Sequence, residues 1–149
     1  MIAVGSDHGG LELKQAICQM LLARGLACED YGTDDSASVD YPDYGAKVAA
    51  AVAAAKVDAG ILICGTGIGM SIIANKYPGV RAALVHDDFT AQMAKEHNNA
   101  NILILGGRVL ATAEALHLVE IWLDSQFEGG RHQSRLDKIA SAERQLQKH

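Results

Sequence analysis

The most constraining stretch of the sequence is the apolar run at 60–64, which ends in Cys64 and continues into the glycine-rich segment at 65–69. A strand-length apolar run, a loop with glycine at every second position and a further apolar segment predict a strand, a phosphate-style turn and a helix N-terminus. In an open parallel sheet, ligands bind just outside the carboxyl ends of the strands. The stretch therefore favours an α/β fold with a ligand site beside Cys64.

Strand-like and helix-like segments alternate along the whole chain, and no hairpin signal interrupts them. We expect strands at 2–6, 26–30, 59–64, 81–85 and 101–105, and helices from 11 to a stop at Gly25 and then at 44–56, 71–76, 88–97, 112–124 and from 131 onward. This pattern predicts one α/β domain over residues 1–149, with a doubly wound five-stranded parallel sheet, helices on both faces (Rossmann or flavodoxin-like) and a C-terminal helix. The expected strand order is the flavodoxin-like 2-1-3-4-5.

Composition excludes several classes of function. The net charge of −5 argues against general binding to nucleic acid. Three widely spaced cysteines agree with a reducing compartment, and the missing CxxC and HExxH motifs predict no metal site. Without a signal peptide or an apolar run of bilayer length, we expect a cytoplasmic protein that does not enter a membrane.

Cys64 is in a different setting from Cys18 and Cys28. The latter two fall on a helix and inside a strand, where a small buried apolar side chain is the simplest interpretation. A helix N-terminus would face Cys64 and favour its thiolate, although a packed thiol is the alternative. The glycines that follow would form an oxyanion site, a nucleotide site whose fingerprint lacks the glycine where Met70 stands, or only a tight turn.

Three further residues are candidates for the same pocket or for a structural role. Asp7 follows the first strand and would lie next to Cys64, but it could instead cap the next helix. Tyr41 either overhangs this pocket or serves packing. His97 ends a predicted helix, where the helix dipole alone could hold it.

The C-terminal segment is basic although the chain as a whole is acidic. Residues 131–149 hold five Lys/Arg and two Asp/Glu, a net of +3, which leaves −8 for the rest of the chain. Arg131 and Arg135 are spaced i, i+4 on one helix face, so a phosphate is a natural ligand for the two guanidinium groups. Arg108, after Gly106 and Gly107 at a strand exit, could be a third.

Several motifs are shared with one known family. They are Val4-Gly5-Ser6-Asp7-His8-Gly9-Gly10, Asp40-Tyr41-Pro42, Ile63-Cys64-Gly65-Thr66-Gly67-Ile68-Gly69, Ala74-Asn75-Lys76, His97-Asn98, Gly107-Arg108 and Glu128-Gly129-Gly130-Arg131-His132-Gln133. With them the chain resembles ribose-5-phosphate isomerase type B over essentially its whole length. The wider family includes isomerases that act on allose 6-phosphate and galactose 6-phosphate.

The resemblance implies a cofactor-free conversion of ribose 5-phosphate to ribulose 5-phosphate through an enediolate. Cys64 would be the base that moves the proton between C1 and C2, and Thr66 would assist transfer between the two oxygens. His97 would open the sugar ring, with Asp7 across from it. The enediolate would be held by backbone N–H groups of the loop, at Gly65, Thr66, Gly67, Ile68 and Gly69.

The resemblance also implies which residues bind the sugar and its phosphate. Tyr41 and Asn98 would hold the sugar, and the phosphate would be bound by His8, Arg108, Arg131 and Arg135. A subgroup of the family has a glutamate where Met70 stands, so this chain resembles the cysteine type. Because one chain carries every feature, we expect a homodimer or a tetramer of identical chains. Whether the sugar has five or six carbons stays open.

The position of His97 suggests an active site built from two subunits. Cys64 and Asp7 follow strands, whereas His97 precedes one, so the sheet separates them by about 17 Å for a strand of five residues. If both act on one substrate, His97 and Asn98 must come from a partner subunit.

Overall fold

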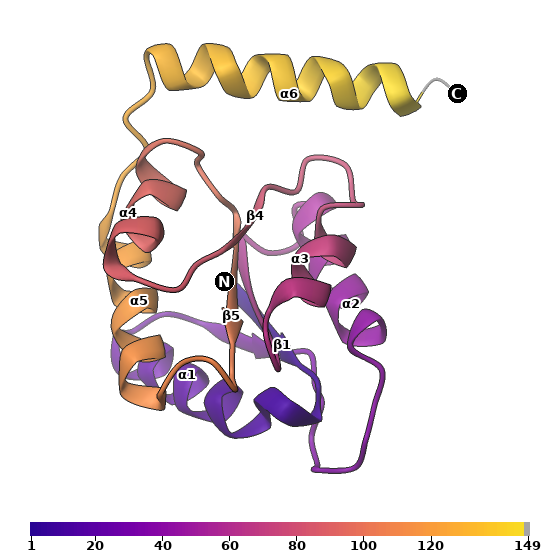
Figure 1. The fold of residues 1–149 in the computed structure, drawn as a ribbon, viewed down its shortest axis with the longest axis vertical. Coiled ribbons are helices and arrows are strands. Elements are labelled where there is room, and N and C mark those ends of the chain that lie inside the picture. Colours follow the sequence, from indigo (N-terminus) through magenta and orange to yellow (C-terminus); the bar gives the residue numbers. More distant parts are fainter. Residues whose placement is uncertain (148–149) are drawn as a thin grey trace.

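The computed structural model describes residues 1–147, which form a parallel five-stranded sheet with helices on both faces (Figure 1). The strands are β1 (Ile2–Ser6), β2 (Cys28–Asp30), β3 (Ala59–Cys64), β4 (Ala82–Leu84) and β5 (Ile102–Gly106). All four strand pairings are parallel, so the predicted fold class is confirmed.

The strand order is β2-β1-β3-β5-β4, so the expected 2-1-3-4-5 order is wrong in its last two positions. All five residues of β5 are buried, as in a strand that is covered on both faces and has a neighbour on each side. Strand β4 has only three residues, and none of them is fully buried. It therefore lies at the edge, while the predicted adjacency of β1 and β3 is confirmed.

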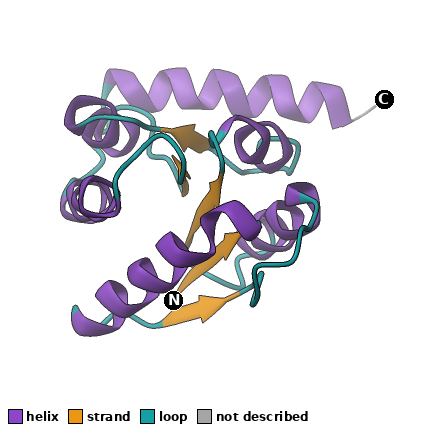
Figure 2. Cartoon of the chain, turned by 60° about the horizontal axis from the view of Figure 1, so that its bottom comes forward, coloured by secondary structure: helices purple, strands orange, loops and turns teal. Residues whose placement is uncertain are grey.

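Two helical layers cover the sheet, as Figure 2 shows. On one face, α1 (Leu11–Ala23), α4 (Asp88–Glu96) and α5 (Thr112–Asp124) bury an apolar core that includes Ile17, Leu103 and Trp122. On the other face, α2 (Tyr41–Ala53) and α3 (Ile68–Ala74) pack Val48 and Met70 against the sheet. The strongly apolar strands thus have helices on both sides, as the alternating sequence predicted.

Two helices begin earlier than the sequence predicted, because residues assigned to the preceding loops belong to the first helical turn. Helix α2 begins at Tyr41 and not at 44, with Pro42 in its first turn. Helix α3 begins at Ile68 and not at 71, because Gly67 caps it in the left-handed region with φ of 82°. Asp87 caps α4 and exchanges hydrogen bonds with Thr90, as expected for a helix that starts at Asp88.

The free edge of β4 is bound by an asparagine side chain. The amide of Asn75, just after α3, donates to the Ala82 carbonyl over 3.0 Å and accepts from the Ala82 N–H over 2.9 Å. Ala82 lies in β4, and among residues 1–147 the only strand that pairs with β4 is β5. The Asn75 side chain therefore takes the place of a neighbouring strand at this residue.

Helix α6 (Arg131–Gln147) lies across the end of the molecule opposite to the end at which β5 finishes (Figure 1). Leu136 is buried, whereas Ile139 and Leu146 are exposed. Among residues 1–147, no helix combines the length and the apolar character needed to cross a bilayer.

Candidate active site

Cys64 and Asp7 lie side by side at the carboxyl ends of neighbouring strands. Ser6 of β1 is in register with Ile63 of β3, and the Asp7 N–H donates to the Ile63 carbonyl over 3.2 Å. Cys64 is a free thiol and only 5% exposed. The shared register therefore places a carboxylate and a thiol at one edge of the sheet, as the strand topology predicted.

Asp7 has a structural role with one of its two oxygens. Its Oδ1 accepts from the Gly9 N–H over 2.9 Å and caps a short 3₁₀ turn at His8–Gly10. The longer helix α1 has Gly10 at its N-cap, so Asp7 does not cap α1 directly. The Nδ1 of His8 accepts from the Val39 N–H over 3.1 Å, which leaves the proton of a neutral His8 on Nε2.

The glycine loop is closely covered by neighbouring side chains. A Cβ at Gly69 would lie 2.4 Å from Cζ of Tyr41, so the Tyr41 ring rests directly on the loop. Thr66 is exposed, and its hydroxyl oxygen accepts from the Ile68 N–H over 3.2 Å. Glycine at position 69 allows the Tyr41 ring to come this close to the backbone. Tyr41 therefore overhangs the loop.

Arg108 belongs to the same edge of the sheet as Cys64. Its backbone N–H donates to the Gly65 carbonyl over 2.9 Å. Its guanidinium lies against two glycines, with nitrogens 3.6 Å from the positions that Cβ atoms would take at Gly9 and Gly65. The positively charged guanidinium of Arg108 therefore lies beside both loops, the one that follows β1 and the one that follows β3.

A second cluster of side chains lies at the other end of the strands, near their amino termini. His97 is the C-cap of α4, and its ring stacks on that of His132 with centroids 4.0 Å apart. Glu128 lies beside both rings, with carboxylate oxygens 4.0 Å from Nε2 of His97 and 3.6 Å from Nε2 of His132. Burial lowers the pKa of His132, and the neighbouring His97 lowers it further, which favours the neutral form of this imidazole.

His132 and Glu128 are contacts that sequence reasoning missed. They lie more than 30 residues after His97, and only their own i, i+4 spacing links them in the sequence. Asn98, Arg131 and Arg135 are exposed near this cluster, the last two on α6. A cavity of about 230 Å³ between α6 and β4 includes Asn98 in its lining.

The chain does not bring these two groups of residues together. Gly106 at the end of β5 is in register with Cys64, whereas His97 precedes the first residue of β5. The five residues of β5 alone span about 17 Å at roughly 3.3 Å per residue. The predicted site residues thus form two half-sites: an upper half-site at the carboxyl ends of the strands (Asp7, His8, Tyr41, Cys64, 65–69, Arg108) and a lower half-site (His97, Asn98, Arg131, Arg135).

One group of side chains has the composition of a metal site. Ligand atoms of His97, Glu128 and His132 lie within 4.8 Å of one another. The two imidazole rings are stacked at an interplanar angle of 16°, however, and an ion bound by an imidazole lies close to the plane of that ring. Two stacked planes do not share one ion, so this geometry fits ring stacking beside a carboxylate better than metal binding.

Comparison with known proteins gives consistent matches over nearly the whole chain. The family model described as Ribose/Galactose Isomerase matches residues 2–139. Ribose-5-phosphate isomerase B of Escherichia coli strain K12 is 47% identical over 142 residues, 95% of either chain. The structure of Clostridium thermocellum ribose-5-phosphate isomerase B superposes with a TM-score of 0.95 at 51% identity, covering 97% of this chain and 98% of that one. The enzyme from Mycoplasma genitalium, solved with bound ribulose-5-phosphate, gives 0.93 at 44% identity, covering 96% and 95%.

Proposed function

The chain belongs to the ribose/galactose isomerase family, and on that premise we propose that it interconverts ribose 5-phosphate and ribulose 5-phosphate. It is a sugar-phosphate aldose–ketose isomerase. The observation that carries the choice of chemistry is the placement of Cys64 beside Asp7 at the start of a glycine loop. Aldose–ketose exchange needs a base for the C–H proton and positive dipoles for the enediolate.

Cys64 is the proposed base that moves the proton between C1 and C2. The thiol is nearly buried, so water has little access to it. Backbone N–H groups of the loop at 65–69 would hold the enediolate oxygens, and the exposed Thr66 hydroxyl would move the proton between O1 and O2. These groups belong to the chain itself, and the proposed mechanism uses no cofactor.

His97 is the proposed group that opens the sugar ring, and in this proposal it comes from a second copy of the chain. The upper and lower half-sites lie at opposite edges of one sheet, so a two-fold dimer could join each upper half-site to the partner's lower one. Asn98 would then hold the sugar together with Tyr41. Glu128 and the neutral His132 would orient the His97 ring.

The phosphate would be bound by cations from both copies. Arg108 lies at the same edge as Cys64, so Arg108 and His8 would come from the subunit that supplies the base. Arg131 and Arg135 lie at the start of α6 and would come with His97 from the partner. This division follows from the two half-sites and extends the sequence-based expectation, which left the source of each arginine open.

Exposed apolar side chains near the glycine loop support a contact with a second copy. Five large apolar residues around this edge are exposed to between 36% and 68%: Ile68, Ile72, Leu84, Val109 and Phe89. The Leu84 side chain lies beside Gly67, and the Val109 side chain lies beside Gly106, each close to where a Cβ atom would be placed. Large apolar side chains exposed in this number are typical of an interface when they gather on one face of a protein.

The test of the proposed base is the Cys64→Ala variant in a ribose 5-phosphate isomerase assay. We expect kcat to fall by at least about 10²-fold, the lower range for general-base catalysis, while the substrate still binds. Cys28→Ala, which removes a thiol far from the loop, is the matched control and should retain activity. A near-normal kcat in Cys64→Ala would exclude this thiol as the base. Allose 6-phosphate assayed in parallel would decide between five- and six-carbon sugars.

The shared site is tested by complementation. Cys64→Ala and His97→Ala should each be nearly inactive on the ring-closed sugar. After mixing and re-annealing, each heterodimer would have one site with both changes and one intact site, so activity should return. If subunit exchange is demonstrated and activity does not return, His97 acts in the site of its own chain and the two-subunit model is wrong.

A further inference from the structure

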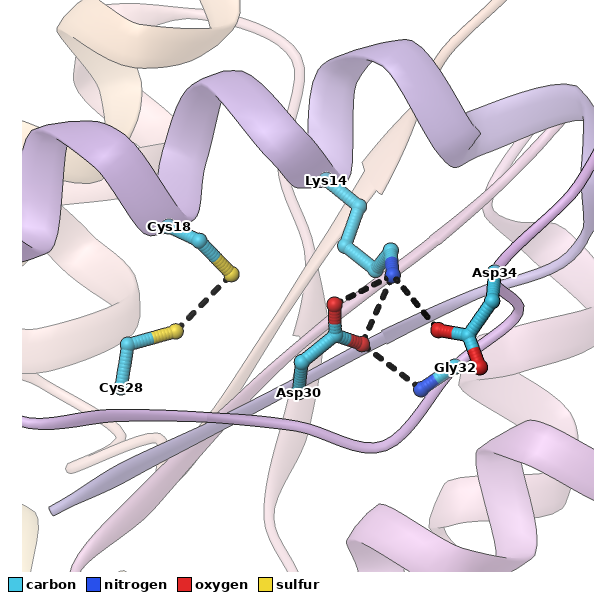
Figure 3. A network of polar contacts seen from close by, with 6 residues as sticks. All are labelled: Lys14, Cys18, Cys28, Asp30, Gly32 and Asp34. Carbon is cyan, nitrogen blue, oxygen red and sulfur yellow. Dashed lines mark hydrogen bonds and ion pairs between the residues drawn. The ribbon is translucent and has the colours of Figure 1, made fainter.

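Cys18 and Cys28 face each other across the contact between α1 and β2 (Figure 3). Their Sγ atoms are 2.8 Å apart, closer than two sulfur atoms in ordinary van der Waals contact, and both thiols are free. Each side chain is partly exposed. The simple interpretation of two independent small apolar residues therefore misses that they form a pair.

An ion pair fixes the same two elements beside this thiol pair. Lys14 lies one helical turn before Cys18, and Asp30 lies two residues after Cys28 (Figure 3). The Lys14 Nζ donates to both carboxylate oxygens of Asp30, over 2.7 and 2.6 Å. This ion pair fixes α1 relative to β2 next to the two cysteines, and so keeps the two sulfur atoms facing each other.

We propose that Cys18 and Cys28 are a disulfide-forming pair, which a low-molecular-weight disulfide of the glutathione type oxidises to an intramolecular bond. The first cysteine thiolate attacks the small disulfide and releases one thiol. The second cysteine then attacks the mixed disulfide and releases the other thiol. In sum, two protein thiols are oxidised and one small disulfide is reduced to two thiols, so atoms and electrons balance.

The geometry needs little adjustment for this bond. A disulfide has its sulfurs about 2.05 Å apart, so the two Sγ atoms need to approach by only about 0.8 Å. Their partial exposure leaves a route for the small oxidant. The two residues enclose a short loop that contains the turn between α1 and β2.

The surroundings make the first step slow. Burial, the partner thiol and Asp30 raise the pKa of Cys18 to about 12, and Lys14 only partly opposes them. Burial also raises the pKa of Cys28, and the opposing effect of its contact with the Cys18 thiol is smaller. Little thiolate is present at neutral pH, so we expect a bond that forms over hours and resists reduction.

The bond would tie an edge strand to the helix behind it. Strand β2 has three residues, and in the part of the chain that the structure describes it pairs only with β1. The segment after β2 includes Val39, whose N–H donates to His8. Closing the loop between the two cysteines should raise the thermal midpoint by on the order of 5–10 °C, from the chain-entropy estimate for a loop of this length and the usual size scaling.

The experiment uses the full-length native protein, which is incubated with glutathione disulfide and then denatured in excess N-ethylmaleimide, so that every remaining thiol is blocked as it becomes accessible. Trypsin cleaves after Arg24, so Cys18 falls in the peptide 15–24, Cys28 in 25–47 and Cys64 in 57–76. We expect non-reducing mass spectrometry to find 15–24 joined to 25–47, lighter by two hydrogens than the separate peptides. The oxidised protein should also show the higher thermal midpoint.

Two variants separate this bond from other thiol chemistry. Cys64→Ser should still form the 15–24/25–47 link, whereas Cys28→Ser should lose both the link and the rise in thermal midpoint. The proposal is overturned if the native protein keeps three blockable thiols, carries glutathione on Cys18 or Cys28 as the end product, or links either cysteine to Cys64 or to a second chain. Because the peptide mapping is done on the unmodified sequence, a poorly folding variant does not decide the outcome.

Discussion

Lys14 and Asp30 form an ion pair, and removing the charge of Asp30 should destabilise the protein much more than removing the charge of Lys14. The Lys14 side chain is only 1% exposed, whereas that of Asp30 is 44% exposed. Asp30 also accepts from the Gly32 N–H over 2.8 Å (Figure 3). Without Lys14, the carboxylate keeps this bond and regains water. Without the Asp30 charge, an ammonium group stays buried, with Asp34 as a distant partner at 4.0 Å.

The expected magnitudes follow from these exposures. Removing one partner of a fully buried pair costs about 3–5 kcal/mol, because the other charge stays uncompensated. In Asp30→Asn we expect about 2–3 kcal/mol, since Asp34 remains and the new amide oxygen still accepts a hydrogen bond. Lys14→Met keeps the apolar stem and removes the buried charge, so we expect about 0–1 kcal/mol.

Urea unfolding of the two variants and the double variant measures this difference. At unchanged m-value, the Asp30→Asn midpoint should be clearly lower than that of Lys14→Met, and the double variant should resemble Lys14→Met. The thermal midpoints of the single variants should differ by about 4–8 °C. If Lys14→Met is as destabilising as Asp30→Asn, the burial of the ammonium group is not what makes the pair asymmetric, and the reasoning is refuted.

Two further predictions concern the substrate. Gly69→Ala should raise KM several-fold with little change in thermal midpoint, because its Cβ would push aside the half-exposed Tyr41 ring and leave the core unchanged; an unaltered KM would mean that Tyr41 does not hold the sugar. Replacing both Arg131 and Arg135 with alanine should weaken inhibition by 4-phosphoerythronate, while Arg144→Ala, on the same helix but three turns away, should not; equal inhibition constants would place the phosphate elsewhere.

The sequence contained enough information for the sheet and for the upper half-site. Buried apolar runs at 61–63 and 102–105 are typical of parallel strands, and each strand end is followed by residues able to do chemistry. The neighbourhood of Asp7 and Cys64 follows from the adjacency of the first and third strands. The roles of these residues stay predictions until kinetics test them.

Other features could not be predicted, because they depend on packing between distant segments. The runs at 82–84 and 102–106 are both short and apolar, so the sequence does not show which one is central. The approach of Cys18 to Cys28 depends on how α1 crosses an edge strand. The stack of His97 on His132 depends on the path of the chain before α6.

The Asn75 side chain has a consequence for how this protein behaves at high concentration. Both ends of the sheet are three-residue strands, and an unpaired strand edge can recruit a strand from another molecule. By occupying the outward N–H and carbonyl of Ala82, Asn75 leaves β4 with no complete row of groups for such pairing. We therefore expect the Asn75 amide to hinder the pairing of β4 with a strand of another molecule. Self-association at the outer edge of β4 would then depend on contacts between side chains.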